Sequence, residues 1–440
     1  METVKNDERT LAKLLAVCPN MNFIKHVNRI YQYYDEPKFY QYSAEIYVGD
    51  NETDGYVRKK WKTGGSSMFD EKIAFLKCIA EAIERYSCMR YKRKDLICSS
   101  FKKLNDRAVN PLLFSKFTES QKRTKNFCRF IYDENTPFCW VKSTSLKTNK
   151  HVLIPAQLVF LNYKLVDKRE RYIDIPISTG AAFGTTFNEA LARGFFELVE
   201  RDAFAIMYMN KIPCPKVNLT KIKDYRIEHL LDQMKRYRLE VNMMDITTDL
   251  GIPSFAAVVI NRTKIGPAVQ VGIKSHFDPL QAMVGAFQES LHARCWIRFL
   301  YENKLSEYRN IKASEINSFE QRGIYWYKQN MIEKLNFWLD QEARPIIYPY
   351  VKKPFSGASM VARIKKILNK FDYNLYFVDL TPKQIAKTGC KVVKVISPDL
   401  QPHFFNEKYK LLGGKRLLSV PLSLGYKNTE IFNKLPHPFL

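Results

Sequence analysis

The chain lacks the sequence signals of a membrane-embedded or exported protein. No run of about 18 apolar residues occurs among its 440 residues, so no transmembrane helix is expected. The N-terminal segment has mixed charge and only a short apolar stretch, unlike a secretory signal peptide. Its nine cysteines are odd in number and include no CxxC pair, which argues against a disulfide framework and a structural zinc site. These absences favour a protein of the reducing cytoplasm.

The usual loops and spacings of common enzyme sites are also missing. The Walker A pattern, GxxxxGK followed by Ser or Thr, is absent, which disfavours a P-loop nucleotide-binding protein. The histidines have no metal-ligand spacing, and no Ser–His–Asp or Cys–His pairing is indicated. No long linker or low-complexity tract divides the chain. We therefore expect an N-terminal arm over residues 1–55, packed on one main body over residues 56–440.

Basic residues are in excess, and the net charge is +25. Such an excess predicts attraction to an anionic partner, such as nucleotide phosphates, an acidic peptide or nucleic acid. A solvated, lysine-rich surface is the simpler interpretation for most of these side chains. The net charge alone is therefore compatible with each of these anionic partners.

The stretch Ser178–Phe204, STGAAFGTTFNEALARGFFELVERDAF, predicts a small-residue turn followed by a helix with Asn188 as N-cap. Four charged residues fall in one line along this helix at 3.6 residues per turn: Glu189, Arg193, Glu197 and Glu200. The flanking residues are apolar, and a surface helix would have a broader polar face. The pattern therefore indicates a buried helix whose polar edge faces a cavity.

Two other segments repeat this pattern, at residues 69–85 and 277–294. In all three an alanine precedes a glutamate by seven residues, and a basic residue closes the segment. The corresponding acidic and basic residues are Glu81, Glu84 and Arg85 in the first copy, and Glu289, His292 and Arg294 in the third. Asp70 and Asp278 are the predicted N-caps, and Pro279 suits a first helical turn. The chain therefore contains three copies of one carboxylate-bearing helical unit.

Strand patterns alternate with these helices and predict an α/β (α+β) fold. Expected strands cover residues 127–132, 138–146, 151–160, 172–177, 240–246, 374–380 and 390–396, with a hairpin of 255–260 and 268–273. Helices are expected at 11–17 and 219–238 and through most of 305–372, and Lys62–Ser67 is expected to be a turn.

If the three helices converge, their carboxylates crowd one cavity and repel one another unless cations neutralise them. Hard oxygen ligands with few histidines select Mg²⁺ or Ca²⁺ over zinc, and Mg²⁺ usually also binds substrate phosphates. Arginines and small-residue turns can hold those phosphates. A single ExxER is more often a pair of surface salt bridges. Three copies in register, however, predict a magnesium–nucleotide site.

These segments resemble the YcaO family, from about residue 60 to the C-terminus. The matching motifs are EAIERY at Glu81–Tyr86, STGxAxG at Ser178–Gly184, EALxRGxxELxERDAF at Glu189–Phe204, ExxxxR at Glu289–Arg294 and VISPDLQP at Val395–Pro402. The resemblance implies a fold that binds ATP and Mg²⁺ without a P-loop. It also implies ATP-dependent modification of peptide backbone amides, typically cyclodehydration of Cys, Ser or Thr to thiazoline or oxazoline.

The resemblance assigns roles residue by residue. The implied metal ligands are Glu81, Glu84, Glu197, Glu200 and Glu289. The implied ATP-binding residues are Lys77, Glu81, Arg85, Glu189, Arg193, Arg201 and Arg294. Lys77 stands where many members carry Ser, on the same helix edge as Glu81.

The C-terminal segment resembles the PxPxP end of azoline-forming members, with Pro436, Pro438 and then Leu440 in place of a final proline. We expect this tail to reach the active site, and the terminal carboxylate is a candidate base. Expected partners are a precursor peptide and a separate ThiF-like leader-binding protein, since no such domain precedes the YcaO region; a homodimer is left open, and nucleic acid and membrane are not expected. Two alternatives remain: thioamide formation with a TfuA-like partner, and a non-catalytic peptide- or nucleic-acid-binding protein.

Overall fold

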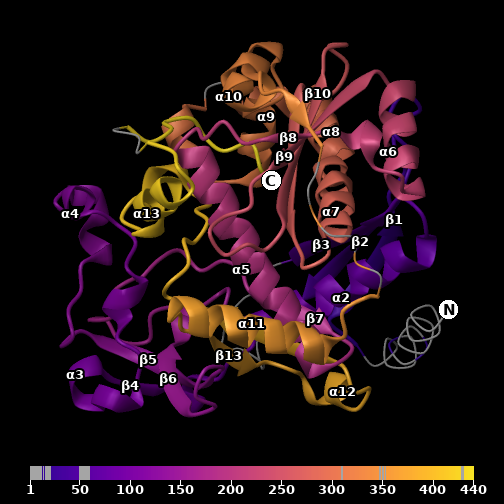
Figure 1. The fold of residues 1–440 in the computed structure, drawn as a ribbon. Coiled ribbons are helices and arrows are strands. Elements are labelled where there is room, and N and C mark those ends of the chain that lie inside the picture. The colour runs from indigo at the N-terminus through magenta and orange to yellow at the C-terminus, as the bar shows by residue number, and fades with distance from the viewer. Residues whose placement is uncertain are drawn as a thin grey trace.

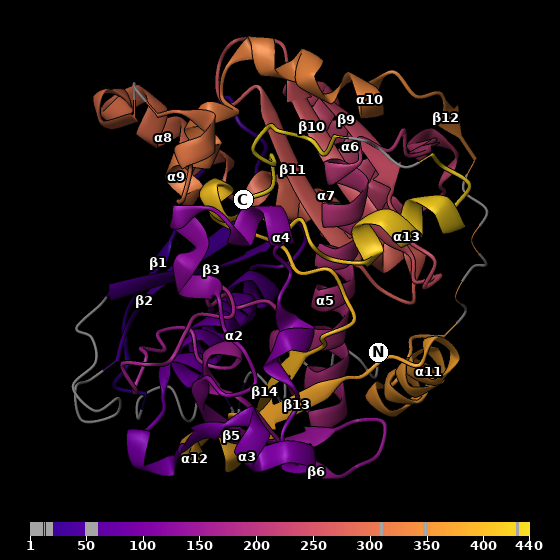
Figure 2. The same cartoon turned by 90° about the vertical axis from the view of Figure 1, so that its left-hand side faces the viewer.

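Three β-sheets and the helices between them make up the computed structural model, which describes residues 12, 14, 21–48, 60–308, 311–345, 348, 351, 353–427 and 431–440. Helix α5 (Phe187–Met209) runs through the middle of the molecule, from the lower sheet to the upper one (Figures 1 and 2). The mixed architecture confirms the α/β class. The helix expected at 11–17 lies almost wholly outside the described residues.

The first sheet is an antiparallel meander of β1 (Ile24–Arg29), β2 (Tyr40–Tyr47) and β3 (Lys60–Ser67). The prediction of a turn at Lys62–Ser67 is therefore wrong, because β3 pairs residue by residue with β2. Its Gly64–Gly65 pair resembles a turn signal in sequence. In the fold these glycines instead make room for a helix that lies directly on the strand.

The second sheet has the order β11-β10-β9-β8-β12. Its strands are β8 (Lys216–Val217), β9 (Leu239–Asp245), β10 (Ser254–Asn261), β11 (Val269–Ser275) and β12 (Ala343–Arg344). The predicted hairpin is confirmed as β10 and β11, which pair in antiparallel register. All eight residues of β10 are buried, since helices cover one face and a large apolar cluster covers the other.

The third sheet has the order β4-β5-β13-β14-β7, and β6 pairs with β5. Its strands are β4 (Ile97–Ser100), β5 (Pro137–Ser145), β6 (His151–Pro155), β7 (Ala181–Gly184), β13 (Tyr376–Asp379) and β14 (Lys391–Ile396). Two strand predictions are wrong. Residues 125–130 form a 3₁₀ helix that buries Phe127 and Phe130 at its three-residue period. Residues 172–177 form no strand, and Pro176 lacks the amide that a ladder needs.

The helices cover and connect these sheets. Besides α5 they are α2 (Glu71–Met89), α3 (Phe101–Leu104), α4 (Glu119–Lys122), α6 (Tyr225–Arg236), α7 (Pro279–His292), α8 (Arg294–Lys304), α9 (Phe319–Tyr325), α10 (Asn336–Leu339), α11 (Gly357–Phe371), α12 (Lys383–Ala386) and α13 (Arg416–Ser423). None of the described helices is long and apolar enough to cross a membrane.

The caps of the three repeated helices follow their sequences with one exception. Asp70 accepts from the amides of Lys72 and Ile73, and Asp278 accepts from the amide of Leu280. The cap predicted at Asn188 is wrong. Thr186 caps α5 through the amide of Glu189, so the helix begins one residue before Asn188.

The three repeated units interlock in a cycle. Each helix packs on the strand before it: α2 on β3, α5 on β7 and α7 on β11. Each also contacts the strand of the next unit: α2 meets β7, α5 meets β11 and α7 meets β3. This closed arrangement turns the acidic edges of the three helices toward a shared centre, as the sequence repeat predicts.

Glycines in the strands allow this close packing. A Cβ built on Gly65 would lie 2.2 Å from the Cys78 amide nitrogen in α2. A Cβ on Gly272 would lie 2.2 Å from both the Ala286 carbonyl oxygen and the Ser290 amide nitrogen in α7. The backbones of strand and helix are therefore in direct contact.

A disulfide joins Cys98 in β4 to Cys139 in β5, although the cysteine pattern of the sequence argues against a disulfide framework. The two residues lie directly opposite each other in the antiparallel ladder. Their separation of 41 residues has no recognisable spacing, so only the strand register brings them together.

The Gly272→Ala substitution should destabilise the protein by at least about 3 kcal/mol, because helix α7 would have to move off β11. Gly285→Ala is the matched control with a much smaller effect, since the nearest atoms to its Cβ belong to the Lys274 side chain, whose Cγ at 2.8 Å can shift, and since alanine favours the helix over glycine by about 0.5–1 kcal/mol. Denaturant unfolding of both variants measures the difference. Equal stabilities would contradict the close-packing argument.

Candidate active site

One glutamate of each repeat is fixed by a backbone amide of the preceding strand segment. Glu81 in α2 accepts from the Gly64 amide at 2.7 Å, and Glu197 in α5 accepts from the Gly180 amide at 2.9 Å. Glu289 in α7 accepts from the Ile273 amide at 3.1 Å. The same contact recurs three times, so each unit holds one carboxylate at the same place relative to its strand.

The carboxylates of different repeats are near enough to raise one another's pKa. Burial, with the charges of Glu197 and Glu81, raises the pKa of Glu84 to about 8 against the opposing effect of Arg85. Burial, with the charge of Glu200, raises the pKa of Glu289 to about 7. Burial also raises the pKa of Glu200, which is 1% exposed. The three acidic edges therefore share one site.

Basic side chains face these carboxylates. Arg85 Nη2 lies 3.0 Å from Glu81 Oε1, and its Nη1 donates to Glu84. Arg201 Nη2 lies 3.5 Å from Glu197 and 3.6 Å from Glu200, and Lys274 Nζ lies 3.2 Å from Glu200 Oε2. Among the described residues, no three or more histidine, cysteine, aspartate or glutamate side chains come close enough together to share a metal ion.

This arrangement still fits Mg²⁺. Magnesium prefers oxygen ligands, keeps several waters and needs only one or two carboxylates besides substrate phosphates, so it requires no cage of protein ligands. The site offers carboxylate oxygens, and burial together with neighbouring carboxylates raises the pKa of Glu84 and Glu289, which a bound cation would oppose. The buried Nε of Arg201 also finds no acceptor in the described part of the chain, so this side chain has a donor free for an anion.

A group of cations contributed by all three repeats lies beside the carboxylates. Burial, together with the positive charges of Lys274 in β11 and Arg193 in α5, lowers the pKa of Lys77 in α2 to about 8. Lys77 Nζ donates to the Ser66 carbonyl at 3.1 Å, and Arg193 pairs with Glu189. Cations that repel one another without a ligand suit a multiply charged anion such as a triphosphate.

Two residues of the third repeat, Arg294 and His292, form no ion pair with the described carboxylates of the site. The Arg294 Nε donates to buried Glu36, and its Nη1 donates to the Pro267 carbonyl at 3.2 Å, so the structure does not bring it to the carboxylates. His292 accompanies Lys77 and Glu81: its Nδ1 lies 3.0 Å from Ser66 Oγ, and burial lowers its pKa.

The C-terminal segment lies next to the site. Pro436, Pro438 and Phe439 are buried, and Leu440 packs on Ile297 and its neighbours. The residue that touches the site is Phe439, which lies between the predicted positions. Its ring centroid is 4.2 Å from Arg201 Cζ.

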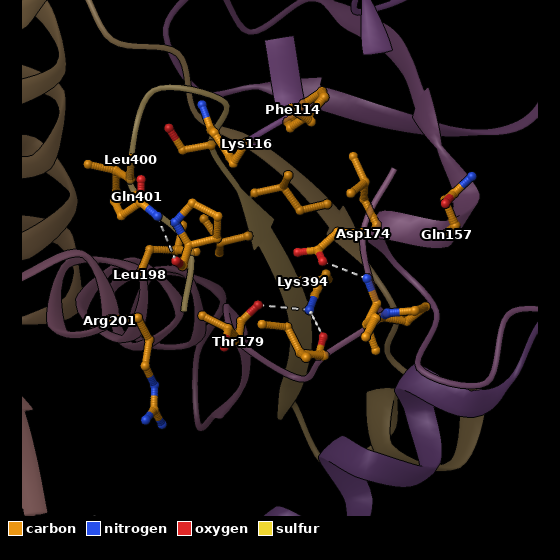
Figure 3. Close-up of a pocket in the computed structure, with 18 residues that line it drawn as sticks. Phe114, Lys116, Gln157, Asp174, Thr179, Leu198, Arg201, Lys394, Leu400 and Gln401 are labelled. Atoms are coloured by element: carbon orange, nitrogen blue, oxygen red, sulfur yellow. Dashed lines mark hydrogen bonds between the residues drawn. The ribbon is translucent and has the colours of Figure 1, made fainter. Parts of the chain in front are cut away.

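A cavity of about 100 Å³ shares Arg201 and Lys394 with the site (Figure 3). Lys394 Nζ donates to the Ile177 and Thr179 carbonyls at 2.8 Å, and its charge acts on Glu84 and Glu197. Asp174 is the sole carboxylate of the lining. Burial raises its pKa to about 7, opposed by a hydrogen bond from the Ile175 amide. The Arg201 guanidinium points away from Asp174 (Figure 3).

Sequence reasoning missed Lys274, Lys394 and Phe439. The two lysines had a signal, because each lies within a mostly apolar strand: Lys274 is the one basic residue of VQVGIKS, and Lys394 stands between the valines of KVVKVI. Phe439 had none, since nothing in its neighbourhood shows which surface the tail meets.

Two curated proteins resemble this chain. An uncharacterised protein from Methanothermobacter thermautotrophicus is 24% identical over 271 residues, which is 60% of this chain and 65% of the relative. An uncharacterised protein in the tfuA 3′ region of Rhizobium leguminosarum bv. trifolii is 29% identical over 180 residues, or 38% and 42% of the two chains. The matches thus span less than two thirds of either relative.

Solved structures share the fold. A heterocyclase in complex with substrate and cofactor has a TM-score of 0.78 at 23% identity, covering 98% of this chain and 57% of its own. The YcaO protein from Methanopyrus kandleri bound with AMPPCP and Mg²⁺ has a TM-score of 0.60 at 16% identity, covering 89% and 91% of the two chains.

A family model described as YcaO cyclodehydratase, ATP- and Mg²⁺-binding, matches residues 68–401, which include all three repeats. Its cofactors agree with the acidic and basic groups of the site. The chain belongs to the YcaO family, with ATP and Mg²⁺ as its cofactors.

Proposed function

We propose that this protein activates backbone amides of a ribosomal precursor peptide with ATP and closes Cys, Ser or Thr side chains into thiazolines or oxazolines. The observation that carries the proposal is the convergence of carboxylates and cations from three repeats. It is supported by the fold similarity to a heterocyclase in complex with substrate and cofactor.

The proposed reaction balances as follows. The side-chain thiol or hydroxyl adds to the preceding carbonyl carbon and loses its proton. The former carbonyl oxygen takes the γ-phosphoryl group and ADP leaves; the C–O bond then breaks as C=N forms, with loss of the N–H proton and release of phosphate. ATP, held with Mg²⁺, supplies the phosphoryl group that turns a poor leaving group into a good one.

We assign roles to the chain's own residues from their positions. Glu81, Glu84, Glu197, Glu200 and Glu289 hold Mg²⁺, while Lys77, Arg193 and Lys274 hold the triphosphate. Arg85 and Arg201 fix the carboxylates, and Arg201 also offers its free Nε to developing negative charge. Glu189 accepts from the Thr185 amide at 2.9 Å and pairs with Arg193, so it orients that cation.

We also propose a precursor peptide, a separate ThiF-like protein that presents it, and a cytoplasmic location. The tfuA setting of one relative keeps thioamide formation as the second candidate, in which sulfur replaces the amide oxygen. Mass spectrometry of a treated peptide separates the two, because cyclodehydration removes one water and thioamidation exchanges oxygen for sulfur. A non-catalytic nucleic-acid-binding role is disfavoured, since carboxylates crowd the centre of the repeats.

Glu197→Gln should lower ATP hydrolysis that depends on Mg²⁺ and a Cys-containing peptide by at least about 100-fold, because it removes a carboxylate charge from the proposed metal site. Its thermal stability should not fall, since the change relieves repulsion with Glu84. Glu240→Gln is the control, because Glu240 of β9 forms an exposed ion pair with Arg262. Full activity in Glu197→Gln would refute the metal assignment.

We further propose that the cavity beside Arg201 receives part of the peptide, whose N–H, O–H or S–H groups can donate to Asp174. Without a ligand, no described cation compensates this carboxylate. A carboxyl whose folded pKa is raised above its unfolded value costs stability at high pH. The cost is absent below the unfolded pKa of about 4, grows as pH rises toward 7, and is constant above it.

Asp174→Asn should therefore stabilise the peptide-free protein by about 1–3 kcal/mol at pH 8, and this gain should vanish near pH 4. Urea unfolding at several pH values measures it. Asp167→Asn is the control with opposite sign, because hydrogen bonds from Arg169 lower the pKa of Asp167 to about 2. A gain in Asp174→Asn that does not change with pH would contradict the proposed environment.

A further inference from the structure

Five consecutive carbonyls of the C-terminal segment are held by side-chain donors from elsewhere in the fold. Lys410 Nζ donates to the carbonyls of residues 433, 434 and 435 at 3.3, 3.0 and 3.3 Å. Tyr208 Oη and Trp326 Nε1 donate to the Pro436 carbonyl at 2.8 and 3.1 Å. Arg322 Nη1 donates to the His437 carbonyl at 2.9 Å. The segment is therefore fixed in place by its backbone.

One of these donors, Arg322, has a side chain that is 0% exposed. Its charge is balanced by Glu407, which also pairs with Lys410 at 3.1 Å. A buried ion pair costs desolvation and is a poor source of net stability. Here Glu407 links Arg322 to Lys410, and both of these side chains hold the tail. The ion pair therefore defines the position of the tail residues that follow His437.

The residue so positioned is Phe439. It forms an isolated bridge with Val271 of β11 and is 4% exposed. One neighbour of its ring is Phe204 of α5, with centroids 5.7 Å apart, and another is the Arg201 guanidinium, with Cζ 4.2 Å from the centroid. A guanidinium at that distance from an aromatic ring is attracted to the negative face of the ring.

Arg201 needs such a support. Its contacts with Glu197 and Glu200 are long, at 3.5 and 3.6 Å, and its Nε has no acceptor among the described residues. These carboxylates alone do not fix the plane of the guanidinium. The Phe439 ring can fix that plane and leave the N–H edge directed at the carboxylates.

We propose that Phe439 is a positioning residue that orients Arg201 against Glu197 and Glu200, and so couples the docked tail to the Mg²⁺–nucleotide site. This inference rests on the proposed function of that site. It assigns to the tail an effect on nucleotide binding that is separate from any contact of the tail with the peptide.

The test compares Phe439→Leu, which keeps apolar volume without the π face, with Phe439→Tyr, which keeps both. Calorimetry with Mg²⁺ and a non-hydrolysable ATP analogue should show a Kd raised about 3- to 30-fold in Phe439→Leu and a change under about 2-fold in Phe439→Tyr. In an Arg201→Lys background, Phe439→Leu should add little, because a lysine has no planar guanidinium for the ring to orient. The assay contains no peptide. If the tail acts only on the peptide, Phe439→Leu should therefore leave the Kd of the ATP analogue unchanged.

Matched variants keep the result interpretable. Tyr33→Leu removes a ring that also lies 4.2 Å from an arginine, Arg298, whose partners are Asp35, Glu36 and Glu302, and its Kd should match the parent. Tyr208→Phe removes only the hydroxyl group, which donates to the Pro436 carbonyl, and should raise the Kd as Phe439→Leu does. It replaces Phe439→Leu in the test if that variant fails to fold.

An unchanged Kd in Phe439→Leu, no recovery in Phe439→Tyr, or additive effects with Arg201→Lys would each overturn the inference. Glu197→Gln in the same assay distinguishes failure of the proposed nucleotide site from failure of the positioning role. If Glu197→Gln binds the nucleotide normally, the proposed site itself fails. If Glu197→Gln loses binding while Phe439→Leu keeps it, only the positioning role fails.

Discussion

Repulsion among carboxylates held close together is the constraint on which the rest of this structure depends. Glu84, Glu197, Glu200 and Glu289 come from three distant segments, and burial adds to their mutual repulsion. The fold opposes this repulsion in two ways. Strand amides donate to one glutamate of each unit, and arginine or lysine side chains face the others. The site thus costs stability that the surrounding packing has to supply.

That packing comes from the cyclic interlock of strands and helices. Gly65 and Gly272 bring α2 and α7 into backbone contact with their strands, which leaves no space for the acidic edges to separate. Most apolar side chains of the same helices are buried, so the hydrophobic effect keeps the helices and their carboxylates together. A helix cannot relieve the repulsion by tilting without exposing apolar surface. Core packing therefore keeps the mutually repelling carboxylates close together.

The sequence predicts what repeats along helices and fails where position depends on other elements. Glu81, Glu197 and Glu289 are found by their spacing, because helical periodicity fixes the face on which they lie. Arg294 lies five residues after Glu289, whereas Arg85 and Arg201 lie four residues after their glutamates. It therefore falls beyond the end of α7, at the start of α8, and turns to Glu36 instead. The Gly64–Gly65 strand, the Cys98–Cys139 pair and Phe439 depend on register or on docking, which no local pattern encodes.

The charges of the site also explain why metal and nucleotide belong together. The glutamates are matched by a similar number of basic groups, namely Lys77, Arg85, Arg201, Lys274 and Lys394. A divalent cation alone would add to the repulsion among the basic groups, and a triphosphate alone would add to that among the carboxylates. Bound as a pair, their charges partly cancel, and each set of groups meets a counter-charge. Lys274 links the two sets, because it pairs with Glu200 and its charge acts on Lys77.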